Sequence, residues 1–556
     1  MSRLSDRSVL GLLLILAALP RLALLDRQGL WVDEVFSLAI ATGHSLEHPA
    51  AEARPELGDY AEPAGPARPA AFRRYLQHDD PPAGPARVVR AVFLSDTSPP
   101  LYYLLLWAWT LAVGTGDAAL RLFSAAWSLA CVPLLWAIGR EVGGRPAAIA
   151  AGLLFAAAPV SLYYSTEGRM YSLLWFCACL FAWATLRLAR EGPRVPFLLV
   201  WIVAAAAGVL THYFFAFVAA ACAGWLLFRP VRLPRIWPLA GGGAAALLAS
   251  PWLLRVPDSL FRWRVTQGWL DGLAPSGVIL LAPAKLAWSF VSTRGHWGNP
   301  PYTEVPVIGV LAALALAVLV AGAWRRLFEG PAALLWLWLV ASCLGPVVFD
   351  LLLTTHTVEV DRYALAGFPA AILLVAAAVA ALRPPALRLA FPALILIAWL
   401  PGAWDVFHNT ARHGNSFREV AALLERRTRP GDLAIVSSIP SGVLGIARYL
   451  GDGPEILSWV EQLGRRSVPG GVAKATAGRP AVVLVVVHTV GAPVPEEAWL
   501  RDHAELKEES QMHAARLLFL GPPEPAGRSL SLPGERRRAA PSAPGRPAPP
   551  ARRSAH

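Results

Sequence analysis

Long apolar runs separated by short polar loops dominate the first 404 residues of the chain. Most of these runs approach the roughly 20 residues that an α-helix needs to cross a bilayer. We predict eleven membrane-spanning helices, near residues 8–25, 119–138, 147–163, 171–188, 196–210, 213–228, 236–253, 305–323, 331–353, 363–382 and 387–404. The pattern therefore predicts a polytopic α-helical membrane protein with about eleven transmembrane helices.

Arginines mark alternate loops between these runs. The loops after the second, fourth, sixth, eighth and tenth predicted helices are short and basic, and read GREVGGR, RLAREGPR, RPVRLPR, WRRLFEG and LRPPALR. By the positive-inside rule these loops are cytoplasmic, together with the N-terminus that carries Arg3 and Arg7. The loops at 26–118 and 254–304, and everything after Trp404, are then expected outside.

The first outer loop contains two unusual segments. Residues 48–90 are rich in Pro, Ala, Gly and Arg, a composition that predicts a poorly ordered insertion. The apolar run at 99–113 is short for a span, so we expect a juxtamembrane or re-entrant helix there. Whether this run crosses the membrane is left open, and the sidedness of all later segments depends on it.

The pattern changes after residue 404. Residues 417–427 have helical periodicity, and the β-rich runs at 432–438 and 481–488 lack alternation, as in buried parallel strands. A charged helix is expected at 496–509 and a last strand at 515–520. We predict a membrane domain over 1–404, a small extracytoplasmic α/β domain over 405–525, and a disordered basic tail over 526–556.

Composition excludes a soluble protein and gives little support to nucleic-acid binding. Charged residues make up only 16% of the chain and hydrophobic residues 55%, whereas soluble domains are about a quarter charged. The net charge is +12, but seven arginines lie in the tail and most others lie in loops. The five cysteines stand inside apolar runs, without the spacing of a metal site or a disulfide framework.

Polar residues at the outer ends of the predicted helices are the candidates for chemistry. Each has a plain structural explanation: acids at a helix N-terminus, a loop-end ion pair, an interfacial arginine or a buried histidine. However, one topology places all of them on the outer face: Asp33, Glu34, Arg121, Glu167, Arg169, His212, Asp361, Arg362 and Tyr363. Arginines suit a phosphate and a carboxylate suits a general base, so this face fits a lipid with a charged head.

Six short motifs follow one another in an order that resembles glycosyltransferase family 39: LWVDEVFS, SDTSPPLYYLLL, ALRLFSAAWS, YYSTEGRMYS, THYFF and DRYALAGFP. These polytopic GT-C transferases are related to protein O-mannosyltransferases and to the aminoarabinose transferase of lipid A. The resemblance covers roughly residues 8–400. It implies transfer of a sugar, hexosyl or mannosyl in kind, from a polyprenyl-phosphate donor to a lipid, glycan or protein acceptor. The expected location is the outer face of a bacterial cytoplasmic (inner) membrane.

The resemblance also implies roles for individual residues. Asp33 matches the catalytic base, and Glu34 completes the acidic pair. The positions expected to bind the donor phosphate or the substrate are Arg121, Glu167, Arg169, Tyr171, His212, Arg362 and Tyr363. Many relatives have His-Pro-Pro where this chain has Ser98-Pro99-Pro100. A divalent cation held by Asp33, Glu34 and Glu167 is left open, because no tight ligand motif is present.

Two other classes of function are weighed against the transferase. A transporter or flippase of a lipid-linked solute would place its site near the bilayer midplane, often between inverted repeats. Here the acids stand at outer helix ends and no repeat is visible. An outward-facing binding or assembly protein would keep the α/β domain and would not need Asp33.

Overall fold

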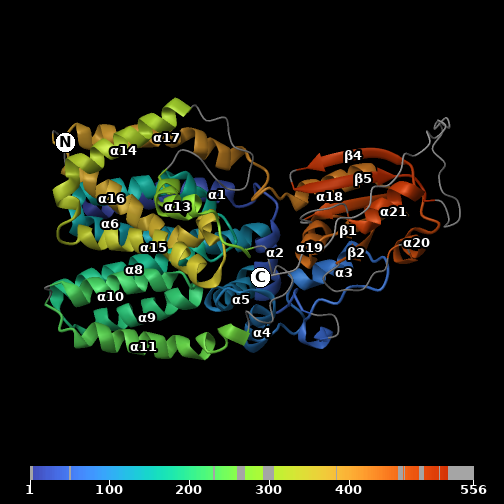
Figure 1. Cartoon of the computed structure of the whole chain (residues 1–556), viewed down its shortest axis with the longest axis horizontal. Coiled ribbons are helices and arrows are strands. Elements are labelled where there is room, and N and C mark those ends of the chain that lie inside the picture. The colour runs from blue at the N-terminus through green and yellow to red at the C-terminus, as the bar shows by residue number, and fades with distance from the viewer. Residues whose placement is uncertain are drawn as a thin grey trace, which may run out of the picture.

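The computed structural model describes residues 4–523, apart from 49–51, 230–231, 259–269, 292–305, 384, 452, 461–467, 469, 488–493 and 513. The predicted tail at 526–556 lies outside the described residues. A helical bundle forms one side of the molecule and an α/β unit the other, with α2 between them (Figure 1). The N-terminus lies at the end of the bundle away from the α/β unit.

Every apolar run that we predicted to span the membrane is helical. The bundle contains α1 Asp6–Leu24, α6 Asp117–Ala157, α7 Pro159–Ser165, α8 Tyr171–Glu191, α9 Val195–Thr211, α10 Phe215–Phe228, α11 Ile236–Leu253, α13 Ser276–Ser289, α14 Pro306–Leu327, α15 Ala332–Leu353, α16 Phe368–Ala381 and α17 Leu387–His408. Within the described residues, seven helices are long and apolar enough to cross a membrane. The chain is therefore a multi-pass membrane protein.

Helix α6 accounts for two of the predicted spans. Its backbone leaves the helical region at Gly143 and Gly144, and Gly144 has φ +73°, a conformation that favours glycine. A Cβ on Gly139 would lie 2.8 Å from the Cα of Ala148, so the two halves pack closely against each other. The element is therefore a helical hairpin with a glycine turn and not one continuous helix.

The segment at 48–90 corrects our expectation of poor order. The first outer loop contains α2 Val32–Ala41, η2 Pro55–Leu57, α3 Pro69–Arg73, η3 Arg74–Leu76, α4 Pro85–Ser95 and α5 Leu101–Val113. Tyr60, Phe72 and Tyr75 are buried within it, and Ala67 forms an antiparallel bridge to Ile456 of the α/β unit. Composition missed this order because a few aromatic residues and a docking partner are sufficient to fix the segment.

Helix α5 covers the run that was short for a span. Its 13 residues extend over about 20 Å, less than the roughly 30 Å of a bilayer core. This length agrees with the expected juxtamembrane helix.

The α/β unit has a five-stranded sheet in the order β2-β1-β3-β5-β4. Its elements are α18 Phe417–Arg427, β1 Leu433–Ser437, α19 Pro440–Tyr449, β2 Glu455–Trp459, α20 Gly470–Thr476, β3 Val482–Val487, α21 Pro495–His503, β4 Leu506–Met512 and β5 Ala515–Leu520. β1 pairs with β2 and β3 in parallel, as the unalternating apolar runs predicted. The charged helix predicted at 496–509 is wrong in its second half, which forms the exposed edge strand β4.

Candidate functional site

The candidate site lies where the bundle meets the α/β unit, and it begins at the first turn of α2. Glu34 is fully buried and accepts a bidentate pair from Arg121, with Nη2–Oε2 at 2.7 Å and Nε–Oε1 at 2.9 Å. Its oxygens also accept from the backbone N–H groups of Gly168 and Trp31. Burial would raise the pKa of Glu34, but the charge and hydrogen bonds of Arg121 hold it below its usual value.

Arg121 has no donor left for another ligand. Its remaining N–H groups donate to the backbone carbonyls of Leu25, Gln28 and Gly29. A guanidinium has five N–H donors, and all five are used here. In this arrangement Arg121 holds Glu34 and the chain before α2, and its predicted contact with a donor phosphate stays a prediction.

Asp33 is bound much more loosely. Its side chain is 22% exposed, and its Oδ2 lies 3.8 Å from both Arg169 Nε and Arg362 Nη1. These are ion-pair distances, too long for hydrogen bonds. Within the described part of the chain, no hydrogen bond of the Asp33 side chain is found, so this carboxylate keeps its acceptor capacity next to two cations.

Arg169 is fixed by a polar group that our reading of the sequence missed. Its Nη1 donates to Tyr103 Oη at 2.9 Å, to Asp96 Oδ2 at 3.3 Å and to Ser37 Oγ at 3.3 Å. Tyr103 in turn donates to Asp96. Burial alone would raise the pKa of Asp96, but Arg169, Tyr103 and Ser98 keep it below its ordinary value. Asp96 and Tyr103 stand within SDTSPPLYYLLL, so the motif was the available signal.

A turn at 412–415 brings a second missed group into the site from the connection between α17 and α18. Arg412 and Asn415 exchange both backbone hydrogen bonds. His413 at the tip has φ +47°, which is unusual for a residue with a side chain. Its ring lies 4.0 Å from that of Trp31, and its Nε2 lies 3.5 Å from Glu167 Oε2. No pattern in the sequence indicated that His413, 246 residues after Glu167, would contact it.

Aromatic rings form the wall beside the two arginines. The Tyr171 ring lies 6.4 Å from that of His212, and His212 lies 6.3 Å from Tyr363. His212 follows α9 and accepts a hydrogen bond from the backbone of Phe214. Burial, assisted by the charge of Arg169, lowers the pKa of His212 to about 4, so the ring is neutral at neutral pH. Its position agrees with a structural histidine that also borders the site.

Several buried polar atoms at the site have no hydrogen-bond partner among the described residues: Trp31 Nε1, Glu167 Oε1 and Arg169 Nε. Such atoms are costly unless a ligand or water satisfies them. Two donors and one acceptor are thus available, and a sugar phosphate could form hydrogen bonds with both kinds of group. No group of three metal-ligating side chains is found in the described residues, and Glu34 is fully engaged, so we derive no step through a metal ion.

The structure brings together nine of the residues that the sequence suggested: Asp33, Glu34, Arg121, Glu167, Arg169, Tyr171, His212, Arg362 and Tyr363. Asp33, Arg169 and Arg362 meet directly, and Glu34 and Arg121 form a pair beside them. Glu167 reaches this group through Gly168, which donates to Glu34, and through His413. Trp175 Nε1 and Trp338 Nε1 donate to the carbonyls of Leu365 and Ala366, which fixes the turn that carries Arg362 and Tyr363.

Known proteins with a similar fold can now be compared. The chain resembles the solved structure of ArnT from Cupriavidus metallidurans bound to undecaprenyl phosphate, with a TM-score of 0.55 and 13% identity over 93% of this chain and 98% of that one. The chain has the GT-C fold. Residues 97–254 of this GT-C chain match the family described as dolichyl-phosphate-mannose-protein mannosyltransferase. The resemblance predicted from the six motifs is thereby confirmed.

Two further structures are more distant from this GT-C chain. ArnT from Cupriavidus metallidurans in the apo state is 13% identical over 86% of this chain and 95% of that one, with a TM-score of 0.49. The oligosaccharyltransferase of Archaeoglobus fulgidus tethered with an acceptor peptide is 14% identical over 86% and 68%, with a TM-score of 0.42. No curated protein sequence matches the chain.

Proposed function

We propose that this GT-C protein is a membrane glycosyltransferase that moves a sugar from a polyprenyl-phosphate donor to an acceptor hydroxyl on the outer face of the cytoplasmic membrane. The observation that carries the proposal is the Asp33 carboxylate, partly exposed and 3.8 Å from two arginines. The fold, the match to the mannosyltransferase family, and undecaprenyl phosphate bound to a protein of similar fold support it.

In the proposed reaction Asp33 takes the proton of the acceptor hydroxyl. The acceptor oxygen attacks the anomeric carbon, a new glycosidic bond forms, and the bond from that carbon to the lipid phosphate breaks with inversion. The lipid phosphate leaves with the electron pair, and Arg169 and Arg362 stabilise the charge that develops on it. The proton on Asp33 then passes to solvent, because this side chain is partly exposed.

The test uses purified full-length protein with undecaprenyl phosphates carrying mannose, glucose or aminoarabinose, and envelope extract as the acceptor source. Release of undecaprenyl phosphate is measured. Asp33→Asn removes the proton acceptor with little change in shape, so turnover should fall by about a hundredfold to ten-thousandfold while donor binding persists. Asp26→Asn is the matched control, since Asp26 is exposed on the same side and pairs with Arg418.

A folded Asp33→Asn protein with the turnover of the unmodified chain would contradict the proposed mechanism. Transbilayer movement of the donor without chemical change would instead support the flippase. A product with a new glycosidic bond separates the transferase from both the flippase and the binding protein.

A further inference from the structure

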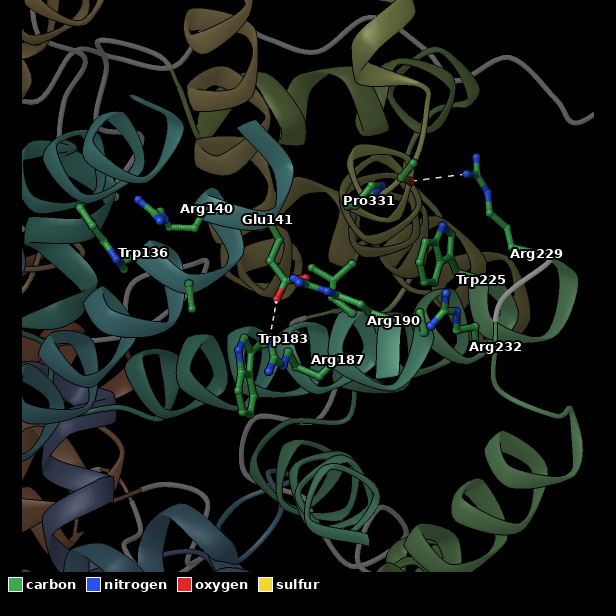
Figure 2. A pocket seen from close by; sticks show the side chains of 14 residues that line it. Trp136, Arg140, Glu141, Trp183, Arg187, Arg190, Trp225, Arg229, Arg232 and Pro331 are labelled. Carbon is green, nitrogen blue, oxygen red and sulfur yellow. Dashed lines mark hydrogen bonds and ion pairs between the residues drawn. The ribbon is translucent and has the colours of Figure 1, made fainter. Parts of the chain in front are cut away.

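A cavity of about 980 Å³ is lined by residues of α6, α8 and α10 and by the chain before α15 (Figure 2). Helix α8 links this cavity to the candidate site, because it begins at Tyr171 in the site and passes the cavity at Arg187 and Arg190. At 1.5 Å per residue these points are about 25 Å apart along the helix. The cavity is therefore separate from the candidate site.

Five arginines line this cavity: Arg140, Arg187, Arg190, Arg229 and Arg232. Arg140 pairs with Asp6 at 3.0 Å, and Arg187 pairs with Glu141 and Glu191. For the other three, no ion pair is found among the residues that the structure describes. The cavity thus has an excess of positive charge, contributed by the ends of α8 and α10 and the chain that follows α10.

The cavity also contains a buried donor without a partner. Trp225 lines it and is only 6% exposed, yet its indole Nε1 has no hydrogen-bond acceptor in the described structure. Arg187 Nε, also in the lining, lacks one as well. An anion with several acceptor oxygens would satisfy these N–H groups and offset the arginine charge together, which is what a phosphate ester provides.

The surroundings favour a lipid as the source of that phosphate. Trp136 and Trp183 line the same cavity, and tryptophan is typical of the membrane–water interface. Phe228, next to Arg229, is 86% exposed, and Leu337 on α15 is 45% exposed. Phe228 offers an apolar surface for acyl chains beside Arg229 of the cavity lining, whereas a free phosphate would use none of it.

We propose that this cavity binds the headgroup of an anionic glycerophospholipid, with the phosphate near the indole N–H of Trp225 and the arginines of the lining. Arg229, which donates to the carbonyl of Gly330 at 3.5 Å in this structure, and Arg190 are the arginines chosen for the test. The site is independent of the proposed transferase reaction. Each arginine near the membrane surface contributes about 1 kcal/mol to the binding of anionic lipid. Loss of two of these arginines should therefore weaken binding by at least about tenfold.

The experiment is a titration of the full-length protein in detergent with dioleoylphosphatidylglycerol, with bound lipid counted by native mass spectrometry. We expect retention of this lipid at concentrations where dioleoylphosphatidylcholine is lost. The double variant Arg190→Ala with Arg229→Ala should lose it. The double variant Arg325→Ala with Arg326→Ala should retain it, because it removes the same charge from exposed positions at the end of α14, outside the cavity.

Two further variants keep the test decisive if the double variant does not fold. Arg190 is exposed, so Arg190→Ala alone should fold normally and weaken binding about fivefold. Trp225→Phe keeps the ring and removes the N–H, and should weaken binding about threefold. Normal unfolding temperatures in detergent confirm that these losses are local.

Three outcomes would overturn the proposal. Equal losses in the two double variants would reduce it to general attraction between the membrane and a basic surface. Equal retention of phosphatidylcholine would remove the preference for an anionic headgroup. Displacement of the lipid by inorganic phosphate would identify a site for small soluble phosphates instead.

Discussion

Two neighbouring parts of the candidate site treat charge in opposite ways. On the sealed side, which we define as Glu34 and Arg121, both side chains are fully buried and every donor of the guanidinium is used. On the open side, defined as Asp33, Arg169 and Arg362, the carboxylate stands 3.8 Å from each cation. Asp33 and Glu34 are adjacent in the sequence, yet the turn of α2 directs them into these two environments.

The difference separates folding from chemistry. A buried, fully bonded pair stabilises one arrangement of the chain and leaves nothing for a substrate. A loosely held carboxylate can accept a proton, and Arg169, whose Nε has no hydrogen-bond partner among the described residues, can donate to a phosphate oxygen. Substitutions on the sealed side should therefore change stability first, and substitutions on the open side should change turnover first.

The largest effect is expected from Glu34→Gln. The amide cannot offset the charge of Arg121, and breaking a buried ion pair on one side costs about 3–5 kcal/mol. We expect a large loss of folded protein in the membrane, measured as yield and as unfolding temperature in detergent. If Glu34→Gln folds normally and loses only turnover, Glu34 belongs to the open side and the comparison fails.

A smaller effect separates the two arginines. Arg169→Lys keeps the charge but loses the planar guanidinium that contacts Ser37, Asp96 and Tyr103, so turnover should fall by about tenfold. This is less than the roughly hundredfold fall in turnover that follows removal of a hydrogen-bond donor to the transition state. Arg121→Lys leaves buried backbone carbonyl groups without hydrogen-bond donors and should lower the free energy of unfolding by about 1–3 kcal/mol. Donor binding and unfolding temperature are measured on both variants. A reversal of these patterns would move the donor phosphate to Arg121, as the family resemblance implies.

The turn at 412–415 sharpens the comparison because His413 contacts Trp31, and the Arg362 guanidinium of the open side lies 5.8 Å from the Trp31 ring. His413→Asn is the suitable change, since asparagine tolerates a positive φ. It removes the ring contact with Trp31, worth about 0.5–1.5 kcal/mol, so turnover should fall about threefold to tenfold with normal folding. Unchanged turnover in a folded His413→Asn protein would exclude the turn from the site.

The smallest effect concerns the dependence of stability on pH. The pKa of His212 is about 4 in the folded protein and about 6.5 when unfolded. The unfolded state therefore gains a proton first, and the stability due to neutral His212 is full above pH about 6.5 and decreases as the pH falls toward 4. At pH about 5.5 the unmodified protein should have lost about 1 kcal/mol of unfolding free energy through His212, and the His212→Asn variant should not show this loss. Melting temperatures of both proteins across this range provide the measurement, and parallel curves would contradict it.

Much of the fold could be predicted from sequence because apolar length and periodicity act locally. The helices near 8–25 and 417–427, and the parallel strands at 432–438 and 481–488, follow from such patterns. β4 was missed because LKEESQM is a charged edge strand whose pairing with β5 no local pattern reveals. The site was predictable where motifs mark it. The contact of His413 with Glu167 depends on the docking of distant segments, which a single sequence does not encode visibly.

The turn at 412–415 also determines what a shortened form of the protein can do. All the helices of the bundle that the structure describes are complete by His408, yet two side chains that border the site, Arg412 and His413, come later. A premature stop codon between these points would leave a protein that keeps the described helices of the bundle and lacks one wall of its site. The shortest gene fragment worth selecting for activity must therefore encode residues beyond Asn415.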